Sequence, residues 1–107
     1  MTSPSAARYA DVVPYDTPTR LADLVGPTTG TVRVGAHIDT SPVPVYDLDD
    51  PDQVWALYTR VVRDGTPQDQ ARLLNRDLLV SLWPTLQLPP RCRLVWVSRF
   101  SELSSAA

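Results

Sequence analysis

The chain has 107 residues and a mass of 11.8 kDa, which is the size of one domain rather than of a two-domain enzyme. Apolar residues make up 43% of it, enough for a single core, so we expect a folded domain rather than a wholly disordered chain. The net charge of −2 excludes a uniformly basic nucleic-acid-binding surface, and one Cys with one His excludes a disulfide scaffold, a zinc finger and a His-rich metal centre.

Residues 1–16 are small, polar and proline-containing, without a helical or strand period. We expect a flexible acidic tail that orders on a partner protein, with Tyr9, Tyr15 and Asp16 as contact residues. The tail lacks the charged and apolar regions of a secretory signal, and no run of the chain approaches the roughly 20 apolar residues of a membrane span. We therefore expect a cytoplasmic protein with no membrane partner.

A short helix is predicted after this tail. Thr17 can cap it, Pro18 suits its first position, and Gly26 with Pro27 ends it. Leu21, Leu24 and Val25 fall on one side of this helix and are expected to face the core.

Two strands follow and form a hairpin. Residues 30–38 (GTVRVGAHI) alternate apolar and polar side chains, which predicts a half-buried strand. A second strand is predicted at Val45–Leu48 after a six-residue connection, at a sheet edge because Pro42 and Pro44 cannot donate to a ladder. Two strands alone are not stable, so the hairpin must pack against helices.

The strongest predicted element is an amphipathic helix that Asp50 caps and Gly65 ends. Thr66 and Pro67 start another helix. A break at Asn75 is predicted, because in one continuous helix Leu73 and Val80 would lie off the common apolar face. The resulting segment, Arg76–Trp83 (RDLLVSLW), is apolar nearly all round, which predicts a buried helix.

The last segment, Pro90–Phe100 (PRCRLVWVSRF), is ambiguous: its initial proline favours a helix, whereas RLVWVSR has strand propensity. We favour the helix and leave a third strand open. The predicted fold is α+β, a mainly helical small domain of three to four short helices with one β-hairpin and a flexible N-terminal tail. Residues 17–103 form the single domain, and residues 104–107 a frayed end.

Candidate catalytic sites are sparse. His37 and Asp39 form an H-x-D on a predicted strand, which places both side chains on one face and would suit a metal-dependent hydrolase. A second His ligand is missing, so a surface His is the preferred interpretation. We interpret the acidic run DLDDPD as the capped start of a helix at Asp50. We expect Cys92 to be a reduced thiol in the core. We expect no catalytic residue, no cofactor and no metal.

Two candidate binding clusters remain near the C-terminus. Trp83, at a helix end before a proline, is the tryptophan freest to serve a protein interface. Arg91, Arg93, Trp96 and Arg99 combine phosphate-binding side chains with an aromatic platform, so the alternative function is a small DNA- or RNA-binding regulator.

Residues 45–103 carry the motifs Y-D-L-D-D-P, L-N-R-D-L-L, L-W-P and R-F followed by E-L. In these motifs the chain resembles small, largely uncharacterised proteins of high-GC bacteria whose genes lie before those of nucleotidyltransferase-type toxins of the abortive-infection class. The resemblance implies an antitoxin or an associated regulator. Its motifs are mostly caps and core positions, so they specify a fold more than an activity, and LVWV stands where a helix-friendly stretch is usual.

The charge is unevenly placed, with a sum of −5 over residues 1–53 and +3 over residues 54–107. A flexible acidic arm can cover a basic, nucleic-acid-handling site on a partner. We therefore expect a non-enzymatic protein-binding module, with an antitoxin as the specific hypothesis.

Overall fold

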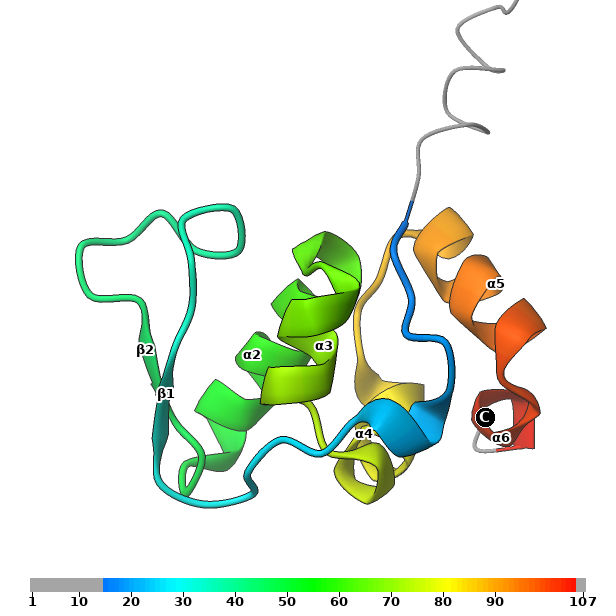
Figure 1. Cartoon of the computed structure of the whole chain (residues 1–107), viewed down its shortest axis with the longest axis horizontal. Coiled ribbons are helices and arrows are strands. Elements are labelled where there is room, and N and C mark those ends of the chain that lie inside the picture. The colour runs from blue at the N-terminus through cyan, green and yellow to red at the C-terminus, as the bar shows by residue number, and fades with distance from the viewer. Residues whose placement is uncertain (1–14, 106–107) are drawn as a thin grey trace, which may run out of the picture.

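The structure, a computed structural model, describes residues 15–105 and is α+β and mainly helical, as the sequence predicts (Figure 1). Along the chain the elements are η1 (Leu21–Asp23), β1 (Thr31–Arg33), β2 (Val45–Asp47), α2 (Pro51–Asp64), α3 (Pro67–Leu73), α4 (Arg76–Leu82), η2 (Trp83–Thr85), α5 (Pro90–Arg99) and α6 (Ser101–Ser105), where η marks a 3₁₀ helix. The hairpin lies at one end of the molecule, α5 and α6 lie at the other, and the remaining helices fill the middle (Figure 1). None of the helices in the described part is long and apolar enough to cross a membrane.

Helix α2 forms the centre of the core, and its predicted ends are confirmed. The Asp50 carboxylate accepts a hydrogen bond from the backbone N–H of Asp52 at 3.0 Å, and Pro51 occupies the first turn. A Cβ at Gly65 would lie 2.7 Å from the carbonyl oxygen of Val61, so the end of the helix requires a glycine. The fully buried side chains of α2 are Leu57, Tyr58, Val61 and Val62.

The predicted break between α3 and α4 is also confirmed. Thr66 and Asp69 form a complete capping box at the start of α3. The Asn75 side chain accepts from the backbone N–H of Leu78 at 3.1 Å, which caps α4. Two short capped helices replace one long one, so each can turn its own apolar residues toward the core.

Residues 90–99 are helical, which resolves the ambiguity of the last segment in favour of the preferred helix. The buried side of α5 consists of Cys92 and Trp96, and Trp96 contacts Trp83 at a centroid distance of 6.1 Å and Phe100 at 5.7 Å. Helix α6 continues to Ser105, two residues past the expected domain end at 103.

The hairpin is shorter than predicted. Strand β1 ends at Arg33, and β1 and β2 pair antiparallel with Val32 opposite Tyr46. Beyond β1 the chain turns, because the backbone N–H groups of Ile38 and Asp39 both donate to the carbonyl of Gly35, at 3.0 and 3.1 Å. The connection therefore covers residues 34–44 rather than six residues, and the expected placement of residues 37 and 39 on one face of a strand is wrong.

The helix predicted after Thr17 is only the single turn η1, with Arg20 rather than Thr17 in the capping position. Val25 does not face the core with Leu21 and Leu24, since it is 76% exposed. Its backbone N–H donates to the carbonyl of Ala71 at 3.1 Å, and an isolated antiparallel bridge pairs Val25 with Asn75. These backbone contacts require an extended chain, so they override the helical pattern.

Candidate protein-binding groove

Helix α4 is less buried than its sequence predicts. Of its four apolar side chains only Leu79 is fully buried, while Leu78, Val80 and Leu82 are partly buried. The helix lies at the margin of the domain (Figure 1), so the core covers one side of it. The prediction of a helix buried all round is therefore wrong, and part of its apolar surface remains open to solvent.

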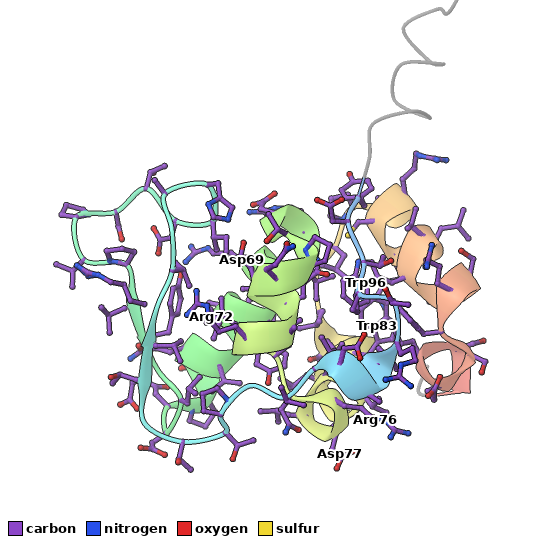
Figure 2. All side chains as sticks on the ribbon, viewed as in Figure 1. Asp69, Arg72, Arg76, Asp77, Trp83 and Trp96 are labelled. Carbon is purple, nitrogen blue, oxygen red and sulfur yellow. The ribbon has the colours of Figure 1, made fainter. Side chains whose placement is uncertain are left out.

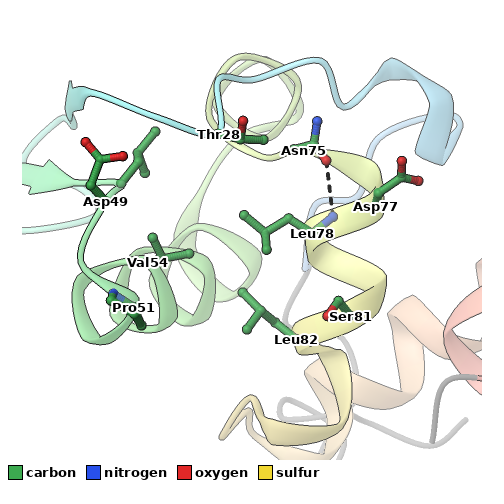
Figure 3. A pocket seen from close by; sticks show the side chains of 10 residues that line it. Thr28, Asp49, Pro51, Val54, Asn75, Asp77, Leu78, Ser81 and Leu82 are labelled. Atoms are coloured by element: carbon green, nitrogen blue, oxygen red, sulfur yellow. Dashed lines mark hydrogen bonds between the residues drawn. The ribbon is translucent and has the colours of Figure 1, made fainter.

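The open side of α4 faces the first turns of α2 across a groove of about 540 Å³. Figure 3 shows Pro51 and Val54 of α2 on one wall and Leu78 and Leu82 of α4 on the other. The remaining lining residues are Thr28, Leu48, Asp49, Asn75, Asp77 and Ser81. The groove thus has apolar walls with a small number of polar groups, the composition that binding sites usually have.

The charge of the groove is negative. Asp49 and Asp77 line it, and none of its lining residues is basic. Figure 2 shows Asp77 at the outer edge of α4, and the neighbouring Arg76 is paired with Glu102 at 3.7 Å. The groove is therefore suited to apolar groups that carry a cation beside them.

Two hydrogen bonds from α2 hold the two ends of α4 at a set distance. The Tyr58 hydroxyl accepts from the backbone N–H of Asn75 at 2.8 Å, just before α4 begins. The Trp55 indole Nε1 donates to the carbonyl of Thr85 at 3.1 Å, at the end of η2, the 3₁₀ turn that directly follows α4. Burial raises the pKa of Tyr58, so its hydroxyl stays protonated at neutral pH. The groove is consequently preformed by the fold.

None of the expected protein-contact residues that the structure describes lines the groove. Tyr9 is outside the described residues. Tyr15 is partly buried against the core, and the carbonyl of Asp16 accepts from the Gln70 side chain at 2.8 Å, so these two residues of the predicted tail pack on the domain. Trp83 is 0% exposed and packs against Trp96 (Figure 2), so the expectation that it is free for an interface is wrong. The domain uses its large side chain to fill the core.

The alternative nucleic-acid cluster is also not assembled as expected. Trp96 is 0% exposed and cannot stack on a base. Arg93 donates to the carbonyls of Trp83 and Leu86, and its guanidinium lies over the Trp83 ring at 4.9 Å from the centroid. Arg91 is partly buried, and Arg99 is exposed. The predicted combination of an aromatic platform with phosphate-binding arginines is therefore not formed, because Trp96 is buried and Arg93 bonds to the domain itself.

His37 and Asp39 contact different partners. The His37 Nε2 atom lies 2.6 Å from the Asp69 carboxylate at the start of α3. The Asp39 carboxylate accepts from the Tyr46 hydroxyl at 2.6 Å and lies 3.5 Å from an Arg60 nitrogen on α2. Among residues 15–105 no group of three His, Cys, Asp or Glu side chains is placed to hold a metal ion. These contacts attach the hairpin connection to α2 and α3, which the sequence pattern did not reveal.

Cys92 is a buried free thiol, as expected. Burial, with a smaller contribution from nearby Asp64, raises the pKa of the thiol to about 11. The thiolate, which is the nucleophilic form, is therefore scarce at neutral pH.

Sequence reasoning did not find the groove, because its walls come from three segments that are distant in the chain: residue 28, residues 48–54 and residues 75–82. One signal was present: RDLLVSL is more apolar than the helix can bury, so two of its leucines are left for the groove. Comparison with family models, with curated proteins and with solved structures finds no match for this chain.

Proposed function

We propose that the protein is a non-enzymatic protein-binding module that holds a helix of its partner in the groove between α2 and α4. The observation that carries this proposal is the open apolar side of α4, which two hydrogen bonds from α2 keep at a set distance. An unpaired apolar surface costs free energy in water, and a partner helix that covers it removes this cost.

The shape and charge of the groove favour a helix as the occupant. Leu78 and Leu82 are four residues apart on α4 and present a ridge about one helical turn long. A partner helix can lay apolar side chains of the same spacing against this ridge, the recognition mode of amphipathic helices in grooves. Asp49 and Asp77 then favour a partner with Arg or Lys beside those apolar side chains.

The resemblance of residues 45–103 supports a more specific partner, a nucleotidyltransferase-type toxin in the cytoplasm, which this protein would neutralise as an antitoxin. A surface that handles nucleotides or nucleic acid is rich in Arg and Lys, and the acidic groove complements such a surface. Residues 1–16, with their acidic excess, can add a second contact on the same partner.

The test blocks the groove from its surface. Ser81 is exposed and lines the groove, so Ser81→Arg fills it and offsets one of its two negative charges without removing a core side chain. Thr40→Arg, at an exposed position in the hairpin connection, adds the same charge away from the groove. The full-length wild type, Ser81→Arg and Thr40→Arg proteins are each used to capture partners from the source cells. The partner that mass spectrometry identifies is then purified, and its affinity for each of the three proteins is measured by calorimetry.

We expect the Thr40→Arg control to bind the purified partner like the wild type. Ser81→Arg should bind at least about tenfold more weakly, equivalent to ~1.4 kcal/mol. Equal affinities of the two variants would refute the groove as the binding site.

A further inference from the structure

A solvent-exposed valine stands beside one end of the groove. Val25 is 76% exposed, and its backbone forms an isolated antiparallel bridge with Asn75, which lines the groove. The residues on either side of this pair are joined by backbone hydrogen bonds of 2.8 and 3.3 Å, from Gly26 to Leu74 and from Arg76 to Leu24. This pattern defines a non-hydrogen-bonded pair, in which both side chains stand on one face with Cβ atoms about 4.5–5.5 Å apart. The Val25 side chain therefore lies next to the groove.

Val25 lengthens the apolar surface that the groove begins. Thr28, three residues after Val25, lines the groove close to Asn75 (Figure 3). Along α4 the wall runs from Leu82 to Asn75, seven residues or about 10 Å of helix. The bridge adds ~5 Å to reach Val25. The whole surface is thus ~15 Å long, which matches about three turns of a partner helix.

The fold does not need an apolar side chain at this position. A β-branched residue suits the extended backbone of the bridge, and threonine has the same branching as valine. Val25 is 76% exposed, so its methyl groups add little to the core. Its apolar surface is available to a molecule that lies in the groove.

We propose that the groove and Val25 form one continuous docking surface for a basic amphipathic helix of the partner, about three turns long. The groove belongs to this surface, so the assignment rests on the proposed function and deepens it by specifying the length and apolar spacing of the partner helix. Apolar side chains at positions i and i+4 of that helix contact the ridge of Leu78 and Leu82, and a third at i+7 contacts Val25.

The charge of the surface favours a basic helix over a second copy of this chain. Asp49 and Asp77 line the groove, and none of its lining residues is basic. Arg76, the basic residue of α4, is paired with Glu102 at 3.7 Å. Two copies that packed this surface face to face would bring their carboxylates together, which is unfavourable. Lys or Arg beside the apolar side chains of a partner helix complements these carboxylates instead.

A double-mutant cycle between the protein and synthetic peptides tests the contact at Val25. The first peptide is a helix of about 16 residues on an alanine–lysine background, with leucine at i, i+4 and i+7. The second peptide has alanine in place of the third leucine and the same charge. The affinity of each peptide is measured by calorimetry for full-length wild type and Val25→Thr. Val43→Thr is the matched control, because Val43 is 71% exposed in the hairpin connection, and Ser81→Arg blocks the groove.

We expect wild type and Val43→Thr to bind the three-leucine peptide at least about fourfold more tightly than the two-leucine peptide. Val25→Thr should lose most of this preference, because the third leucine then lacks its apolar contact. Ser81→Arg should bind both peptides weakly. A merely structural role of Val25 would instead lower the unfolding temperature and weaken both peptides equally.

Three results would overturn the inference. The first is an undiminished preference for the three-leucine peptide in Val25→Thr. The second is the absence of peptide binding to the wild type at about 1 mM. The third is self-association of the wild type in analytical ultracentrifugation that Val25→Thr removes, which would assign this surface to a second copy.

The purified partner separates this inference from the proposed function. If Ser81→Arg weakens partner binding but Val25→Thr binds the partner like Val43→Thr, and the peptides show no coupling to Val25, only the extension to Val25 is refuted. If the peptides show that coupling but Ser81→Arg binds the partner like Thr40→Arg, only the proposed function is refuted.

Discussion

Replacing Tyr58 with phenylalanine removes the hydroxyl that positions the start of α4. The hydroxyl accepts from the Asn75 backbone N–H at 2.8 Å, and Tyr58 is fully buried at the centre of α2. The substitution keeps the ring and its packing, so the cost is the lost hydrogen bond and a backbone N–H without its acceptor. A buried donor left unsatisfied costs ~1–3 kcal/mol, and we expect the lower half of this range because Asn75 is only partly buried.

The effect on stability is measurable by thermal and chemical unfolding. A loss of ~1–2 kcal/mol corresponds to a fall in Tm of roughly 4–10 °C for a domain of this size. Tyr46→Phe is the matched control, since its hydroxyl contacts Asp39 and Arg60 at the hairpin rather than α4. Both variants should lose stability, but only Tyr58→Phe should loosen the groove.

Amide hydrogen exchange distinguishes the two. In Tyr58→Phe the Asn75 amide should exchange faster through local opening, by more than the loss of global stability explains. In Tyr46→Phe the exchange rate of this amide should rise only as far as the loss of global stability requires. An Asn75 amide that stays equally protected in Tyr58→Phe would refute the assignment of this hydrogen bond as the brace of α4.

Three further outcomes follow from the packing and the titrating groups. Gly26→Ala should destabilise the domain by ~1–3 kcal/mol in urea unfolding, because the new Cβ would lie 2.6 Å from the backbone of Leu73; unchanged stability would contradict this close approach. Hydrogen bonds, chiefly from Tyr46, lower the pKa of Asp39, and at Asp69 partial burial opposes ionisation but hydrogen bonds led by that from His37 prevail and lower its pKa. Both pKa values lie below the ordinary 3.8, so the two carboxylates contribute their full share to the free energy of unfolding above that pH, and this share is lost as the pH falls through the folded-state pKa values. Asp69→Asn should therefore weaken the dependence of the unfolding free energy on acid pH, as measured by unfolding at a series of pH values. The Cys92 thiol, whose pKa burial raises to about 11, should react with a thiol reagent at pH 8 only at the rate of unfolding, and rapid labelling of the folded protein would show that it is accessible.

Local signals predicted the helices well because capping acts over three or four residues. Asp50, Thr66 and Asn75 each accept the backbone hydrogen bond expected of a helix cap, and Gly65 ends α2 where a Cβ would collide. These contacts lie within one turn of the helix, so no knowledge of the tertiary fold is needed to place them.

The failures occurred where distant segments compete with a local pattern. Alternation over residues 30–38 predicted a continuous strand, but a turn at Gly35 takes residues 37 and 39 to α3 and α2 instead. Val25 has a helical spacing with Leu21, yet its backbone pairs beside α3. The prediction that Trp83 is exposed failed for the same reason. Its position before a proline carries no information about the ring of Trp96, which packs against it in the fold.

The groove lies at the limit of what the sequence can indicate. The pattern of apolar and polar residues showed that α4 is too apolar to lie on the surface. It could not show which side of α4 stays open, because that depends on where the fold places α2, residue 28 and residues 48–49. The pattern thus identified a helix that needs covering, and only the fold identified the side left open.

The most direct test of the proposed function is the affinity of the purified partner for the full-length Ser81→Arg and Thr40→Arg variants, measured side by side. Both substitutions add one arginine at an exposed position, and only the first occupies the groove. We predict that Thr40→Arg binds like the wild type and that Ser81→Arg binds at least about tenfold more weakly. Equal affinities would place the binding site elsewhere on the protein and contradict a groove that serves the partner.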